Sequence, residues 1–272
     1  MPVPGISSLL LAATGLSRAY GADALNVDPW LELGSPESAV RASIFVGSGV
    51  TIGSASVNDP AMLIRFWDGS VIDLIVAGRI GAAGGDGGDG DRHGGSGVGS
   101  FRGGGGGGGA GTNPGAKGLR YPETDPDAGN LDGSAGTTTT GGSGGVSDFG
   151  DDITPFGGYI AGDQTDRIAI NPGLLIWPAD GHSITVNIWC SGSITAGGNG
   201  GVGGYKDGDL PGGANDAEDG EDLPDYYTAA QGTLTDHPAI WYRFLAVTLN
   251  IREGGAYPNI KGRVVFSGSQ PS

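Results

Sequence analysis

Glycine tracts with a three-residue rhythm limit what this chain can fold into. In "GGNGGVGGY" (197–205) two glycines precede each side chain, three times in succession. The same rhythm opens "GGDGGDGDRHGGSGVGSFRGGGGGGGAG" (84–111) and recurs in "GGSGGVSDF" (141–149). Fixing one backbone residue costs about 1–2 kcal/mol, with glycine at the upper end, and these tracts have few side chains to bury. An ordered tract therefore needs backbone hydrogen bonds to its neighbours.

A helix with three residues per turn can supply those bonds. In polyproline-II geometry the side chains fall on three faces, and no hydrogen bond forms within the helix. A GG-x repeat leaves two faces bare, so neighbouring chains can approach and bond through N–H and C=O groups. We therefore favour packed polyglycine-II helices over flexible linkers, which are the alternative. The side chains that share a register are Asn199, Val202 and Tyr205 in one tract, Ser143, Val146 and Phe149 in another, and Asp86, Asp89, Arg92, Val98 and Phe101 in the longest, where Asp91, His93 and Arg102 break it.

Strand signals dominate outside the tracts. Three pairs of apolar runs are separated by turn residues, and an Asp-Gly dipeptide lies between the members of the first two pairs. Asp-Gly accepts positive φ and is typical of a β-hairpin. We therefore predict a mainly β fold of antiparallel hairpins in sandwich-like units, with little α-helix. The pairs are "AMLIRFW" with "VIDLIVAGRI", "GLLIW" with "HSITVNIWC", and "WYRFLAVTLNIR" with "IKGRVVFSG".

Two of these units resemble each other. Residues 68–90 and 180–204 both run from a turn through an alternating strand to Gly-x-Ile, then Ala, then the GG-x rhythm. This indicates duplicated hairpins that each lead into a glycine tract. Two copies are fewer than a solenoid needs, so no long array is predicted. The expected organisation is an N-terminal docking arm with first strands (1–60), a hairpin unit with its tract (61–150), a second such unit with an acidic loop (151–240) and a C-terminal hairpin (241–272).

The charge balance and the single cysteine exclude several classes. Acidic residues outnumber basic ones by 30 to 14, for a net charge of -16. This disfavours nucleic acid and anionic membrane surfaces, which require clustered Lys and Arg. No apolar run approaches the roughly 20 residues of a membrane span. Cys190 is the only cysteine, which excludes an intramolecular disulfide, and we expect it to be a small buried hydrophobe.

The two strand exits, "AGRIGAAGGDGGDG" and "SGSITAGGNGGVGG", resemble glycine-rich tail-fibre, tail-tip and adhesin proteins of tailed bacteriophages. The resemblance covers about residues 68–111 and 180–205. Some proteins of that group stack glycine tracts into polyglycine-II bundles, and loops at the bundle tips contact the bacterial receptor. It implies a virion structural protein of a fibre, spike or tail tip on the extracellular particle. The implied partners are other virion proteins, further copies of the chain, as in a trimer, and a bacterial surface receptor.

Three other functions stay open as alternatives. The chain could be a capsid-attached decoration or head-fibre protein that stabilises the particle. It could also be a bacterial surface adhesin or a polysaccharide depolymerase. A depolymerase needs only a pair of carboxylates, which leaves no local motif.

The loop "LPDYYTAAQG" (223–232) is the best candidate contact surface. Tyr226 and Tyr227 beside Asp225 suit recognition of a sugar or a protein through stacking and hydrogen bonds. The alternative is that these rings pack against a neighbouring subunit or against the glycine tracts. Tyr205, at the end of its tract, is a further candidate contact.

Signs of catalysis or metal binding are weak. The sequence has no HExxH or Walker motif, and its histidines (His93, His182 and His237) lie in a glycine tract, a turn and a proline-bounded loop. We therefore predict no enzyme activity and no cofactor. "GGDGGD" (84–89) matches the start of a calcium-binding Gly-Asp repeat, but the following residues do not continue it. Solvated Asp86 and Asp89 are the favoured interpretation, with no metal.

Overall fold

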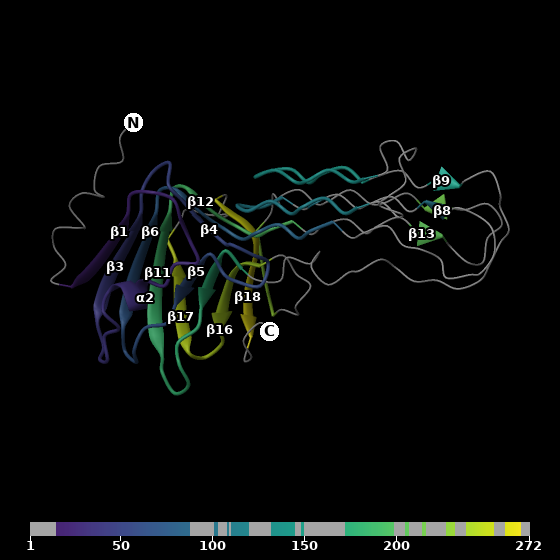
Figure 1. Cartoon of the computed structure of the whole chain (residues 1–272). Coiled ribbons are helices and arrows are strands. Elements are labelled where there is room, and N and C mark those ends of the chain that lie inside the picture. Colours follow the sequence, from purple (N-terminus) through teal and green to yellow (C-terminus); the bar gives the residue numbers. More distant parts are fainter. Residues whose placement is uncertain are drawn as a thin grey trace.

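The computed structural model divides into a stack of strands and a set of extended chains that project from it (Figure 1). The structure describes residues 15–87, 101–102, 108, 110–119, 132–144, 148–149, 172–198, 205–206, 214–215, 227–231, 238–252 and 259–267.

The stack is a parallel β-solenoid, in which the chain winds through three faces. Its first face is a five-stranded sheet whose strands follow chain order, and every neighbouring pair is parallel. Each strand therefore begins a new coil. The strands of this face are β1 (Leu16–Tyr20), β3 (Arg41–Val46), β6 (Val71–Val76), β11 (Ile184–Cys190) and β17 (Val247–Ile251).

The other two faces belong to a nine-stranded sheet, again with parallel pairing throughout. The last strand, β18 (Ile260–Ser267), joins them, because Ile260 pairs with Ile194 on the second face and Val264 pairs with Ile240 on the third. The second face contains β2 (Ala24–Leu25), β4 (Thr51–Gly53), β7 (Arg79–Gly81) and β12 (Ser193–Thr195). The third contains β5 (Met62–Ile64), β10 (Leu174–Ile176) and β16 (Pro238–Arg243), with β15 (Tyr227–Gln231) on the far side of β18.

Aliphatic side chains stack inside the solenoid, one above another in successive coils. Ile44, Leu74 and Ile188 stand in register and are fully buried, as strand alternation requires of residues on one side of a sheet. Burying a side chain of this size contributes roughly 1.5–3 kcal/mol. Further stacks of this kind are Ile52, Ile80 and Ile194 on the second face, and Met62, Leu174 and Ile240 on the third.

Glycine is required at the corner between the first and second faces. A Cβ on Gly192 would lie 1.8 Å from the Gly78 carbonyl oxygen, and a Cβ on Gly78 would lie 2.2 Å from the Val50 carbonyl oxygen. Successive coils therefore pack backbone against backbone at this corner.

The connections from the second face to the third differ greatly in length. Residues 54–61 make this connection after β4, residues 82–173 after β7, and residues 196–237 after β12. The third-face strands keep one register all the same, since Leu174 pairs with both Met62 and Ile240. The longer two connections contain the projecting glycine tracts.

The prediction of antiparallel hairpins in a sandwich is wrong, because the strands on either side of each turn belong to different faces. The turns themselves are in place, with Gly69 at φ +74° and Gly181 at φ +78°. However, β5 pairs with β10 on the third face, whereas β6 pairs with β3 and β11 on the first. A turn motif specifies a change of direction and does not specify the pairing partner.

The predicted repeat corresponds to two neighbouring coils. Val71 pairs with Thr185 and Arg79 pairs with Ser193, so residues 68–90 and 180–204 lie side by side. The expectation that the two units do not belong to a long array is wrong, because the first face has five strands. The expectation for Cys190 is confirmed, because its side chain is buried in the core.

One short helix is present in the described part of the chain, α2 (Pro29–Glu32). The Asp28 side chain caps it by accepting hydrogen bonds from the backbone N–H groups of Trp30 and Leu31, and Pro29 occupies the first turn, where its missing N–H costs nothing. No helix among the described residues is long and apolar enough to cross a membrane.

Candidate functional site

The candidate site is the set of glycine tracts that leaves the solenoid after β7 and β12 (Figure 1). We call its described residues the glycine projection. They are residues 82–87, 108, 110–119, 132–144 and 196–198.

A turn at Thr112 and Asn113 docks the projection on the solenoid. The Thr112 hydroxyl lies 2.7 Å from the Gly81 carbonyl oxygen, to which it donates, and it accepts a hydrogen bond from the Ser54 N–H at 3.3 Å. The Asn113 side-chain amide donates to the Ala55 carbonyl oxygen at 2.7 Å. Groups from two successive coils therefore hold this turn.

Arg79 holds a second turn of the projection. Its guanidinium donates to the Thr138 carbonyl oxygen at 3.0 Å. The turn is closed by a hydrogen bond from the Thr137 N–H to the Thr140 carbonyl oxygen at 2.8 Å. Burial lowers the pKa of Arg79, yet an arginine stays protonated at neutral pH. A cation from the solenoid thus fixes the base of residues 132–144.

Backbone hydrogen bonds link neighbouring tracts at every third residue. Gly84 donates to the Asn113 carbonyl oxygen at 3.0 Å, and Gly87 donates to that of Ala116 at 2.9 Å. Donors and acceptors advance together, so these two tracts run in parallel. The step of three residues equals one turn of a polyproline-II helix.

The same step of three occurs between antiparallel tracts. Gly133 donates to the Gly118 carbonyl oxygen at 3.2 Å, and Gly136 donates to that of Gly115 at 3.0 Å. Here the donor number rises as the acceptor number falls. The chain therefore runs outward along 115–119 and back along 132–137.

The tracts approach so closely that a methyl group has no space at three positions. A Cβ on Gly108 would lie 2.1 Å from the Gly115 carbonyl oxygen, and one on Gly142 would lie 2.0 Å from that of Ser134. A Cβ on Gly111 would lie 2.2 Å from the backbone nitrogen of Gly84. Any side chain here would push two backbones apart.

The predicted tract residues fall partly within the described chain. Ser143 is exposed, and its N–H donates to the Ser134 hydroxyl at 2.7 Å. The Asp86 carboxylate accepts a hydrogen bond from the Ala116 N–H at 2.6 Å, so it serves the packing of two tracts. Among the described residues no three His, Cys, Asp or Glu side chains gather as metal ligands. Asn199, Val202, Val146 and Asp89 lie outside the described residues.

Short antiparallel strand pairs lie far from the solenoid. In the first pair Phe101 stands opposite Phe149, and in the second Tyr205 stands opposite Asn215. The strands β8, β9 and β13 occupy the distal end of the molecule in Figure 1. The pairs are β8 (Phe101–Arg102) with β9 (Asp148–Phe149), and β13 (Tyr205–Lys206) with β14 (Ala214–Asn215).

The predicted contact residues fall in different parts of the chain. Tyr205 belongs to the distal strand β13, whereas Tyr227 begins β15, which pairs with β18 of the solenoid. Asp225 and Tyr226 lie outside the described residues.

The two anchors of the projection were not predicted from the sequence. Thr112, Asn113 and Pro114 directly follow the longest glycine tract (84–111), and such a cluster of turn residues marks a reversal. Arg79 carried no comparable signal, because an arginine on a half-buried strand has many ordinary uses.

We compared the chain with protein families, curated proteins and solved structures. No family model, no curated protein and no solved structure matches it.

Proposed function

We propose that this chain is a structural protein of a tailed-phage virion, part of a fibre, spike or tail tip. In this proposal the solenoid fixes the chain in the particle, and the glycine projection carries distal loops toward a receptor on the bacterial surface. The proposal rests on one observation above all. Backbone hydrogen bonds at every third residue pack the glycine tracts into a rod that extends from a side-chain-packed base.

Two features support presentation of a distal contact. The base of the projection is fixed by Thr112, Asn113 and Arg79, so the rod has a set direction relative to the solenoid. Tyr205 belongs to the distal strand β13, far from the solenoid. The resemblance of the strand exits to glycine-rich phage adhesins agrees with this arrangement.

The test is binding of the purified full chain to envelopes from a panel of bacterial strains. We expect saturable binding to a subset of strains, and Tyr205→Ala should weaken it. The matched control is Thr139→Ala, an exposed change at the base of the projection, which should leave binding intact. Absence of binding to every envelope, together with tight binding to phage capsid or tail proteins, would show a purely structural role. Release of reducing ends from surface polysaccharide would show a depolymerase instead.

A further inference from the structure

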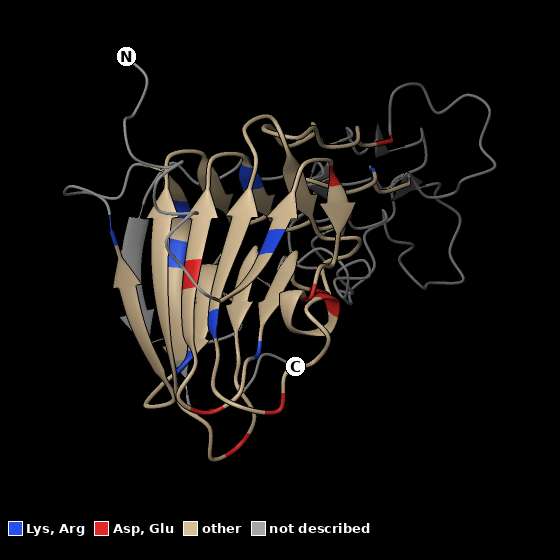
Figure 2. Cartoon of the chain, turned by 90° about the vertical axis from the view of Figure 1, so that its left-hand side faces the viewer, with Lys and Arg blue, Asp and Glu red and all other residues tan. Residues whose placement is uncertain are grey.

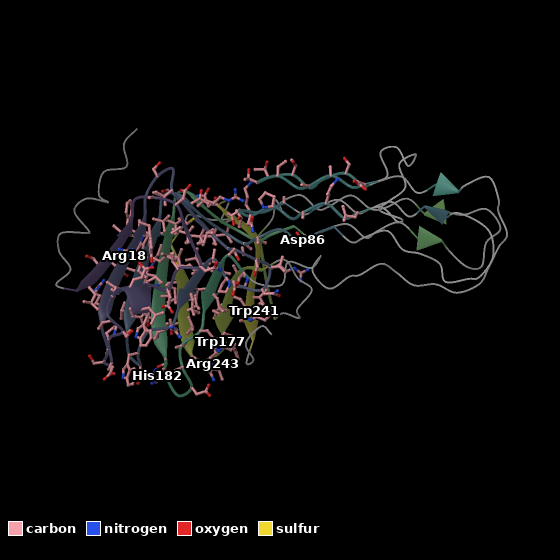
Figure 3. All side chains as sticks on the ribbon, viewed as in Figure 1. Arg18, Asp86, Trp177, His182, Trp241 and Arg243 are labelled. Carbon is pink, nitrogen blue, oxygen red and sulfur yellow. The ribbon has the colours of Figure 1, made fainter. Side chains whose placement is uncertain are left out.

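A groove of about 460 Å³ lies at the corner where the third-face strands end and the next first-face strands begin. The glycine projection leaves from a different corner, after the second face. Figure 3 labels Trp177, His182 and Arg243 at the groove end of the strands. Six side chains define its chemistry: Trp30, Arg65, Trp67, Trp177, His182 and Arg243.

Tryptophans from successive coils line the groove. Trp30 comes from α2 in the first coil, Trp67 follows β5 in the second, and Trp177 follows β10 in the third. The pairing of Ile64 with Ile176 places Trp177 beside Arg65 in the neighbouring coil, and Trp67 follows Arg65 by two residues in the same turn. Trp67 is 39% exposed, although a ring of this size is usually covered in a soluble protein.

Polar groups stand beside the rings. The Arg65 guanidinium lies 4.9 Å from the centroid of the Trp30 ring, and that of Arg243 lies 5.6 Å from the centroid of Trp177. The His182 ring is 4.5 Å from that of Trp67, centroid to centroid. Arg243 also forms an ion pair with Asp180, whose side chain is 94% exposed and so presents its carboxylate to solvent.

We propose that this groove binds a neutral oligosaccharide. A sugar ring has an apolar C–H face and a polar rim of hydroxyl groups. The exposed Trp67 ring and the half-buried Trp177 ring match the former, and Asp180, His182 and Arg243 match the latter. Because groups from successive coils line the groove, more than one sugar unit can contact it.

The local charge selects against an acidic glycan. Arg65 is paired with Asp28 at 2.5 Å, and Arg243 is paired with Asp180, so neither cation is left over for a ligand carboxylate. Asp68 adds a further negative charge in the same set of turns. Figure 2 shows acidic residues in the turns at this end of the strands. The net charge of -16 adds long-range repulsion toward a polyanion.

This site is separate from the distal strands, so it does not depend on the proposed function. The full chain, purified, would be applied to an array of neutral and acidic bacterial glycans. The strongest binder would then be titrated by tryptophan fluorescence. We expect neutral glycans to bind, with a change in fluorescence on titration.

Variants locate the site. The double change Trp67→Ala with Trp177→Ala should weaken binding by about tenfold or more, which corresponds to loss of two stacking contacts. Trp189→Ala, on the outer side of β11 and away from the groove, is the matched control and should bind normally. Asp180→Asn changes an exposed side chain without a risk to folding and should weaken binding about threefold.

Three results would overturn the proposal. They are the binding of no glycan on the array, a preference for acidic glycans, and unchanged binding in both the double tryptophan variant and Asp180→Asn. Failure of the envelope experiment with intact glycan binding would refute the distal contact alone.

Discussion

The solenoid and the glycine projection hold neighbouring chain segments together by different interactions. Both use glycine where backbones meet. The solenoid adds columns of buried aliphatic side chains such as Ile44, Leu74 and Ile188. The projection has backbone hydrogen bonds at every third residue and few side chains between the tracts.

The difference shows where each part obtains its stability. Apolar burial gives the solenoid a driving force that does not depend on the projection. In the projection, each hydrogen bond makes a net contribution of about 1 kcal/mol. This is close to the free-energy cost of fixing the backbone of one residue. The anchors at Thr112, Asn113 and Arg79 therefore matter to the projection far more than to the solenoid. Four measurements test this dependence.

The largest effect should come from the solenoid core. Ile188→Ala removes a fully buried side chain and should lower the free energy of unfolding by about 2–5 kcal/mol. Because the projection is anchored on the solenoid, both parts should lose hydrogen-exchange protection together. Thr248→Ala, an exposed change on β17, should stay within about 0.5 kcal/mol of the unmodified protein. Denaturant unfolding monitored by circular dichroism measures both variants.

A methyl group in the projection should have a local effect. Gly111→Ala places a Cβ 2.2 Å from the Gly84 nitrogen, so the two tracts must separate. Amide exchange across 82–87 and 110–119 should accelerate about tenfold or more, while the unfolding midpoint of the solenoid stays the same. Gly21→Ala is the control, because nothing lies within 4 Å of its added Cβ. A loss of global stability equal to that of Ile188→Ala would refute the independence of the solenoid.

Removal of the cationic anchor should affect one turn only. Arg79→Met removes the hydrogen bond to the Thr138 carbonyl oxygen, and the change should loosen residues 132–144 by about 1 kcal/mol. Because the methionine carries no charge to bury, the lost hydrogen bond is partly offset by a smaller cost of burial. The turn at Thr112 should keep its protection, since it has its own contacts with Gly81 and Ser54. Mass-spectrometric hydrogen exchange distinguishes the two turns, and equal loosening of both would contradict separate anchors.

The smallest effect concerns pH at the Asp68 turn. Hydrogen bonds from Ser183 to its carboxylate lower the pKa of Asp68 below its ordinary value of 3.8. A carboxylate whose pKa is lowered in the folded state stabilises the protein at pH values above the pKa of the unfolded state. This contribution disappears as pH falls through the pKa of the folded state. The unmodified protein should therefore exceed Asp68→Asn slightly in stability at pH 6, and the difference should shrink as pH falls through the folded-state pKa of Asp68. A constant difference between pH 6 and pH 2 would exclude this linkage.

Much of the local structure could be predicted from the sequence. Turns at Gly69 and Gly181, strands on either side of them, and the likeness of residues 68–90 to 180–204 all follow from short-range patterns. The pairing partners could not be predicted, because an apolar alternating strand fits a parallel neighbour as well as an antiparallel one. The hairpin motif then favoured the wrong partner.

The candidate site was only partly predictable. A three-residue rhythm indicates which backbones can pack, but not which tracts become neighbours or where they attach. Thr112 had a visible signal, because turn residues follow the end of the longest tract, whereas Arg79 had none. The groove tryptophans are far apart in the sequence, at positions 30, 67 and 177, and only the winding of the coils brings them to one corner.

The unequal connections after β4, β7 and β12 have a consequence for how the coding sequence can change. The same corner of the solenoid accepts residues 54–61 in one coil and residues 82–173 in the next, and the strands that follow stay in register. Gene segments that encode a projection can therefore be lengthened, shortened or exchanged between related genomes without disturbing the scaffold. The strand register of the scaffold therefore sets no limit on the length of the segment inserted at this corner.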